Sequence, residues 1–229
     1  MRAEILIFPG FDELDAIGPF EVLQHARKRG AEVEARLVSL SGAGEVRGAN
    51  GLRVQAEGFP GERGRPDLLI VPGGGWAARS REGAWTEAQR PELRELLRRS
   101  HSEGALLAAV CSGTMLLAAA GLLRNRRAIT HHTAAEELRA QGTEVVDARV
   151  VDEGDIVTSG GITSGLDLGL WLVERFFGAE LAAQTGRMLE FERRGPILRR
   201  GEEGAALPCP DGDSGQGATG REAAVGGTK

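Results

Sequence analysis

Short apolar runs alternate with segments of helical periodicity along most of the chain. Strand-like runs occupy residues 4–8, 32–39, 67–71, 105–110 and 127–131, and helical patterns occupy about 19–29, 91–103, 111–120, 133–142, 163–177 and 179–191. Segments 46–56 and 145–159 have the alternation and turn residues of hairpins, the first turning at Asn50-Gly51. Strands that alternate with helices predict a doubly wound α/β fold, in which helices sandwich a mostly parallel sheet.

Local signals place the ends of two helices. Pro19 is expected in the first turn of the first helix, which Gly30 would end, because proline suits a helix start and glycine a helix stop. Thr133 and Glu136 have the spacing of a capping box, which predicts that a helix starts there and stops at Gly142.

The last 29 residues differ in composition from the rest of the chain. They contain eight glycines, two prolines, no aromatic residue and no apolar periodicity. Such a segment buries too little apolar surface to offset the entropy of ordering it. We therefore expect one domain over residues 1–200 and a disordered tail over residues 201–229; the alternative is a short ordered extension packed on a partner.

Charge and apolar content argue against several kinds of partner. The net charge is −5, and the arginines are scattered rather than gathered into one stripe, so we expect no binding of nucleic acid. No segment approaches the roughly 20 apolar residues of a membrane span, and the N-terminal apolar run is too short for a secretory signal. We therefore expect a cytoplasmic protein that binds a small molecule and contacts no membrane.

Cys111 is the candidate for chemistry. The other cysteine, Cys209, lies in the predicted tail, so Cys111 is expected to be a free thiol. Ala109 and Gly113 flank it in a small-x-Cys-x-small pattern, typical of a nucleophile elbow between a strand and a helix. Helix N–H groups at such a turn would favour the thiolate and lower the thiol pKa below about 8.5. The alternative is a small buried apolar residue.

Donors and a proton carrier are expected beside the thiol. The amide of Ser112 and the backbone of the glycine run 73–75 could stabilise negative charge, although a tight turn without ligand contact explains that run equally well. Asp15 lies between the first strand and the first helix, at the same sheet edge, where a thiolate would favour its protonated form. It could instead cap the helix, and Asp12 and Glu13 are expected to be solvated loop charges.

The four histidines and the spacing of possible metal ligands give little further indication of function. His25 and His101 are expected at the surface, whereas His131 and His132 follow a strand, so a Cys-His pair is conceivable beside the alternative of structural histidines. No metal is expected, because no pair of ligands has helical or CxxC spacing. No organic cofactor is expected either.

Five segments in order resemble the ThiJ/PfpI superfamily: "FDELDAIGPFEVL", "LLIVPGGG", "AAVCSGTMLLAAAGLL", "RRAITHH" and "VDEGDIVTSGGITSGLDLGLWLVERFFG". The resemblance covers nearly all of residues 4–191 and is greatest toward isonitrile hydratases and the ligand-binding halves of AraC-type regulators. It implies a flavodoxin-like, class I glutamine amidotransferase-like fold, a homodimer, Cys111 as nucleophile and Asp15 as its acidic partner. It also implies that the amides of Gly74 and Ser112 bind an anion and that His131 borders the site.

Departures from the family pattern narrow the expected function. Ser112 follows the cysteine where the protease and glyoxalase branches have histidine and isonitrile hydratases have threonine. Asp15 stands where the deglycase branch has glutamate, whereas isonitrile hydratases have aspartate there. Ser159 replaces a glycine, and His132 replaces the usual tryptophan or proline, which leaves the substrate open. The resemblance therefore implies hydration of isonitriles to N-substituted formamides. A ligand-sensing or redox-sensing protein is the alternative, although no helix-turn-helix pair follows Phe191.

Overall fold

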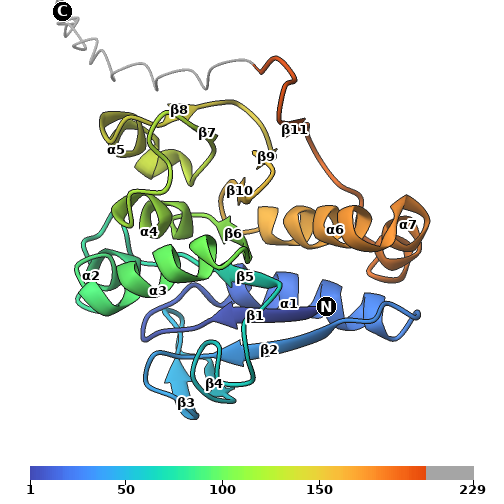
Figure 1. Ribbon diagram of the computed structural model, residues 1–229, viewed down its shortest axis with the longest axis horizontal. Coiled ribbons are helices and arrows are strands. Elements are labelled where there is room, and N and C mark those ends of the chain that lie inside the picture. Colours follow the sequence, from blue (N-terminus) through green and yellow to red (C-terminus); the bar gives the residue numbers. More distant parts are fainter. Residues whose placement is uncertain (205–229) are drawn as a thin grey trace, which may run out of the picture.

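The computed structural model describes residues 1–204 and has a central sheet between two layers of helices (Figure 1). The sheet has the order β11-β9-β10-β6-β5-β1-β2. Its strands are β1 (Arg2–Leu6), β2 (Glu34–Val38), β5 (Leu68–Val71), β6 (Leu106–Val110), β9 (Val150–Asp152), β10 (Ile156–Ser159) and β11 (Ile197–Arg199). Neighbouring strands from β2 to β10 are parallel, whereas β9 is antiparallel to β10 and parallel to β11. The predicted mostly parallel α/β fold is confirmed.

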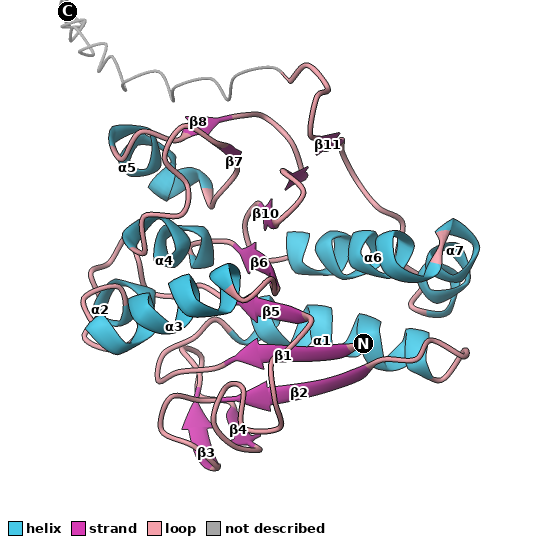
Figure 2. Cartoon of the chain, viewed as in Figure 1, coloured by secondary structure: helices cyan, strands magenta, loops and turns pink. Residues whose placement is uncertain are grey.

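Helices cover both faces of this sheet (Figure 2). They are α1 (Glu13–Arg27), α2 (Ala84–Glu87), α3 (Pro91–Ser102), α4 (Gly113–Ala119), α5 (Ala135–Ala140), α6 (Ser164–Phe177) and α7 (Ala179–Met188), with a 3-10 turn, η1 (His132–Ala134), before α5. Helices α1, α6 and α7 pack together as one layer, and α3 and α4 pack on each other and on β6. The central strands β5 and β6 are fully buried, as their continuous apolar runs predict.

Two small sheets lie outside the main one. The predicted hairpin 46–56 forms from β3 (Gly44–Arg47) and β4 (Arg53–Ala56). The prediction of one hairpin over residues 145–159 is wrong in part, because β8 (Glu144–Val145) pairs in parallel with β7 (Arg127–Ala128). The hairpin consists of β9 and β10 alone, since residues 145–146 lie beside β7 instead.

The first helix begins earlier than predicted. Asp12 is its N-cap, with a carboxylate oxygen that accepts the N–H of Leu14 at 3.3 Å, and the helix starts at Glu13. Pro19 therefore lies inside α1, where it removes one helical hydrogen bond. Its buried ring packs close to Gly165 of α6, since a Cβ at Gly165 would lie 3.2 Å from Pro19 Cδ. Packing between the two helices thus outweighs the usual preference of proline for a helix start.

The predicted capping box does not form. His131 caps η1 instead, because its ring accepts the N–H of Thr133 at 3.3 Å, and Thr133 lies within the 3-10 turn. A histidine side chain two residues before the threonine thus replaces the threonine as the cap.

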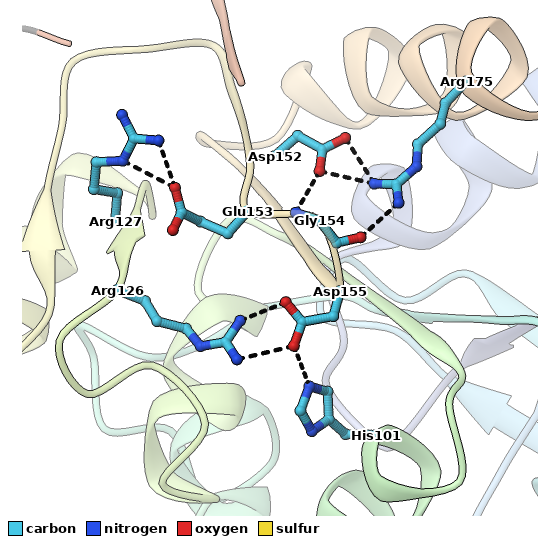
Figure 3. Close-up of polar contacts among 8 residues, drawn as sticks. All are labelled: His101, Arg126, Arg127, Asp152, Glu153, Gly154, Asp155 and Arg175. Carbon is cyan, nitrogen blue, oxygen red and sulfur yellow. Dashed lines mark hydrogen bonds and ion pairs between the residues drawn. The ribbon is translucent and has the colours of Figure 1, made fainter. Parts of the chain in front are cut away.

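A polar network fixes the turn between β9 and β10, at the sheet edge where β10 begins (Figure 3). Asp155 accepts two hydrogen bonds from Arg126, at 2.6 and 2.9 Å, and contacts His101 at 2.7 Å. Arg175 contacts both carboxylate oxygens of Asp152 at 2.7 Å. Residues from α3, α6 and the segment before β7 thereby hold this turn from three sides.

The described residues end at residue 204, just inside the predicted tail. The disordered tail predicted for residues 201–229, with Cys209, lies outside the described residues apart from residues 201–204. Strand β11, which the sequence pattern does not predict, extends the sheet up to Arg199. Among residues 1–204, no helix is long and apolar enough to cross a bilayer.

Candidate active site

The candidate site lies at the carboxyl edge of the central strands. Strands β1, β5 and β6 run parallel, so the segments that follow them meet at one edge. Asp15 follows β1, the glycine run 73–75 follows β5, and Cys111 directly follows β6. The structure thus brings together three segments that are far apart in the sequence.

Cys111 occupies a strained turn between β6 and α4. Its φ of 59° lies in the left-handed region, which costs a residue with a side chain roughly 1–2 kcal/mol. Backbone contacts fix the turn: the Cys111 N–H is shared between Ser159 O at 3.2 Å and Gly160 O at 3.0 Å, and the Thr130 hydroxyl donates to Cys111 O at 2.9 Å. The strand end β10 therefore holds the cysteine backbone in place.

Gly113 is required by close packing of this turn against β5. A Cβ at this position would lie 2.1 Å from the carbonyl oxygen of Val71, much closer than atoms approach one another. The small residue two positions after Cys111 thus allows the elbow to sit directly over the end of the neighbouring strand.

Asp15 is fully buried beside the thiol. It lies in the first turn of α1, and one carboxyl oxygen, Oδ2, accepts the N–H of Gly73 at 3.0 Å. The other oxygen, Oδ1, has no hydrogen-bond partner that meets ordinary geometric limits. The Cys111 thiol is close enough for each group to alter the pKa of the other. Asp15 Oδ1, which has no regular hydrogen-bond partner, is therefore available for proton transfer next to the sulfur.

Burial determines the protonation of this pair. It raises the pKa of the Asp15 carboxyl well above its usual range, and the Asp12 carboxylate raises it further. Burial and the Asp15 charge raise the pKa of the Cys111 thiol to about 12. The expectation of a lowered thiol pKa is therefore wrong, because desolvation outweighs the helix N–H groups. The expected direction of the Asp15 pKa is right, but the expected cause is wrong: burial and then the Asp12 charge raise this pKa, whereas the hydrogen bond with the Cys111 thiol lowers it.

Amide groups close to the sulfur come from two segments. The N–H groups of Ile162 and Ser112 act as hydrogen-bond donors that lower the pKa of the thiol, although burial outweighs them. Ile162 lies just before α6 with a φ of 35°, and nothing in the sequence pattern indicates it. The Gly74 N–H instead donates to the Ser112 hydroxyl at 3.0 Å. The amides of Ser112 and Ile162, rather than that of Gly74, therefore face the sulfur in this structure.

His131 lies beside Gly161 of the loop that follows β10. Its Nδ1 contacts the Thr133 hydroxyl at 2.8 Å, and a Cβ on Gly161 would lie 2.4 Å from the imidazole ring. Burial lowers the pKa of this imidazole, as does the ring of His132, at a centroid distance of 4.2 Å. The ring therefore packs beside the loop after β10, with its Nδ1 directed to Thr133.

Asp12 and Glu13 make structural hydrogen bonds, so the expectation that both are solvated loop charges is wrong. The Asp12 N–H donates to Gly73 O at 2.9 Å, while its carboxylate caps α1. Glu13 accepts the N–H and the side-chain amide of Asn50 at 2.7 and 2.6 Å, which docks the β3–β4 turn onto α1. Sequence reasoning missed both roles; the N-cap preference of aspartate was the available signal for Asp12.

No metal centre is formed by the part of the chain that the structure describes. Within residues 1–204, no group of three or more His, Cys, Asp or Glu side chains is arranged to hold a metal ion. The chemistry available at the site is that of a thiol, a buried carboxyl and backbone amides. Such groups suit nucleophilic addition coupled to proton transfer.

The chain is similar to known proteins over most of its length. The DJ-1/PfpI family model matches residues 1–175. The chain is 29% identical over 197 residues to the isonitrile hydratase of Pseudomonas putida, which covers 86% of this chain and 81% of that protein. It is also 29% identical to the HTH-type transcriptional regulator CdhR of Pseudomonas aeruginosa over 193 residues, 83% of this chain but only 55% of the regulator. A THiJ/PfpI family protein from Pseudomonas syringae superposes with a TM-score of 0.74 at 26% identity, covering 85% of this chain and 76% of that one.

Proposed function

Because the chain belongs to the DJ-1/PfpI family, we propose that it is a cysteine-dependent enzyme that hydrates isonitriles to N-substituted formamides. The observation that carries the proposal is the fully buried Asp15 carboxyl beside the elbow thiol of Cys111. Similarity to a protein named isonitrile hydratase supports the choice of reaction. In this proposal a single domain over residues 1–200 acts in the cytoplasm as a homodimer, without metal or organic cofactor.

The first step joins the thiol to the isonitrile. The sulfur forms a bond to the terminal carbon, the Asp15 carboxyl gives its proton to the same carbon, and the carboxyl takes up the proton that leaves the thiol. The product is a thioimidate, R–N=CH–S–Cys111, and Asp15 is again protonated. Because a carboxyl has two oxygens, it can give one proton and take another within one site.

The second step releases the formamide. Water adds its oxygen to the thioimidate carbon, one water proton reaches the nitrogen, and the carbon–sulfur bond breaks. The other water proton returns to the sulfur, so the products are R–NH–CHO and the free Cys111 thiol. Asp15 mediates these transfers as general base and acid. The amides of Ser112 and Ile162 face the charge that develops around the sulfur.

The raised pKa of Asp15 suits this role. A carboxyl with an ordinary pKa would be ionised near neutral pH and would hold no proton to deliver to carbon. Burial keeps that proton in place. The same burial keeps Cys111 protonated, so the thiol is expected to react when a substrate bridges it and the carboxyl rather than as a free thiolate.

Other activities have less support in the site. Ser112 follows the nucleophile, and His131 directs its Nδ1 to Thr133, so a Cys-His protease or glyoxalase lacks its base. The second candidate is a ligand-sensing or redox-sensing protein, favoured by similarity to the regulator CdhR. A buried thiol with a raised pKa does not favour rapid oxidation, which leaves ligand sensing as the better form of that alternative.

The test is formation of an N-aryl formamide from an aromatic isonitrile. We expect the full chain to produce it and Cys111→Ala to produce none, because no other nucleophile replaces the thiol. Asp15→Asn is expected to lower turnover by roughly 100-fold or more, the usual contribution of a general acid. Cys209→Ser serves as the control for the second thiol and should keep full activity. Turnover that survives in Cys111→Ala would contradict the proposal.

A further inference from the structure

Two aspartates, Asp12 and Asp15, lie at the start of α1. Asp12 and Asp15 lie three residues apart and hold opposite ends of the Gly73 residue. The Asp12 N–H donates to Gly73 O at 2.9 Å, and the Gly73 N–H donates to Asp15 Oδ2 at 3.0 Å. The glycine run after β5 therefore fixes both aspartates at the same sheet edge as Cys111.

The surroundings of the two carboxyls favour different protonation states. Asp15 is completely buried and has one oxygen without a regular partner. Asp12 is half-buried, and its carboxylate accepts the Leu14 N–H at the positive end of the 15-residue helix α1. Partial access to water and a helix N-terminus favour negative charge, whereas full burial favours the neutral acid.

We propose that Asp12 is a positioning residue for the catalytic proton: its carboxylate carries the negative charge of the pair, so that Asp15 keeps the proton beside Cys111. This inference rests on the proposed role of Asp15 as proton donor. Two carboxyls whose surroundings divide charge and proton between them form a recurrent acid–base arrangement in enzymes.

The charges that act on the pair agree with this division. After burial, the Asp12 charge is the main influence that raises the pKa of Asp15; it also raises the pKa of Cys111, on which the Asp15 charge acts more strongly. Burial, followed by the neighbouring Glu13 charge, also raises the pKa of Asp12 although the N–H groups of Leu14 and Asp15 oppose the rise, but the pKa of Asp15 is raised much further above its usual range. His131 also faces Asp12, but burial lowers the pKa of that imidazole, so it supplies little positive charge near neutral pH.

Asp12→Asn tests the proposal because asparagine preserves the N-cap and removes the charge. The readout is the infrared carbonyl band of the protonated Asp15 carboxyl in the full chain, followed as a profile from pH 4 to 10 and assigned by difference from the same protein that also carries Asp15→Asn. This readout needs no isonitrile, so it stays informative if the hydratase proposal fails. We expect the profile of Asp12→Asn to move to lower pH, because the negative charge that raises the pKa of the Asp15 carboxyl has been removed.

Two further variants separate charge from structure. Asp12→Ser keeps a capping side chain without charge and should give the same shift as Asp12→Asn. Glu21→Gln removes an equal charge from the exposed face of α1, beyond the site, and should leave the profile in place. A profile of Asp12→Asn that superposes on that of the natural chain, or moves to higher pH, would overturn the proposal. An equal shift in Glu21→Gln would overturn it as well, since a general change in charge would then explain the effect.

Discussion

At the residue scale, the properties of Asp15 and Cys111 come from where they lie rather than from their types. An exposed aspartate is ionised near neutral pH, but this one is fully buried with an oxygen that lacks a regular partner. Charging it in the folded protein is therefore more costly than charging it in the unfolded chain. In the hydration that we propose, the proton retained in this way is the one that Asp15 gives to the isonitrile carbon.

This cost predicts a pH-dependent effect of Asp15→Asn on stability. A carboxyl with a raised folded pKa contributes stability that is fully present below its unfolded pKa, near 3.8, and is lost as the pH rises toward the folded pKa. Asparagine cannot ionise and has no such loss. We expect the variant to gain on the natural chain from pH 4 to 8, by up to about 1.4 kcal/mol per pH unit in the range where the carboxyl is charged only when unfolded. Urea denaturation at each pH measures the difference, and a difference that does not change with pH would contradict the raised pKa.

The pairing of Asp15 with Cys111 can be predicted from the sequence, but the pKa values of the two groups cannot. The small residues around Cys111 indicate the elbow, and the position of Asp15 after the first strand indicates the shared sheet edge. The extent of burial depends on packing from α1, β5 and α6 together, which no local pattern records. For that reason the expected thiolate was wrong, and the Ile162 amide was missed.

At the element scale, the start of α1 organises the site. Asp12 caps the helix, Glu13 holds the β3–β4 turn, and Asp15 faces the thiol. Three acidic residues at the start of one helix therefore make three different structural contacts. The sequence prediction placed this start at Pro19, which moved the three acids into a loop. Proline is a strong local signal, but here packing between α1 and α6 outweighs it.

Glu13 provides a test of this arrangement. Its carboxylate accepts hydrogen bonds from the Asn50 N–H, the Asn50 side-chain amide and, at 3.3 Å, the Leu52 N–H. These bonds hold the pKa of Glu13 below its usual range although burial raises it. We expect Glu13→Ala to release the turn and lower stability by about 1–2 kcal/mol. Hydrogen exchange should accelerate at Asn50 and Leu52 but not at Val54 in the neighbouring strand; unchanged exchange at the turn would show that the strands alone fix it.

At the scale of the whole molecule, the two edges of the sheet have different roles. The carboxyl edge carries the Cys111 thiol, the two aspartates at the start of α1 and the glycine run 73–75. The opposite edge carries the ion pairs of the β9–β10 turn (Figure 3). These edges are linked, because β10 runs from that turn to the carbonyls of Ser159 and Gly160 that accept the Cys111 N–H. The alternation of strands and helices predicted this layered fold. It did not predict β11, a three-residue strand too short to show periodicity.

The central claim is that Asp15 holds a proton beside Cys111 at neutral pH. Infrared difference spectroscopy of the natural chain against Asp15→Asn at pH 7 measures it most directly, because protonated and ionised carboxyl groups absorb in separate regions. We predict that the difference contains the carbonyl band of a protonated carboxylic acid, which disappears only when the pH is raised well above neutral. A difference that contains only the bands of an ionised carboxylate would contradict the account.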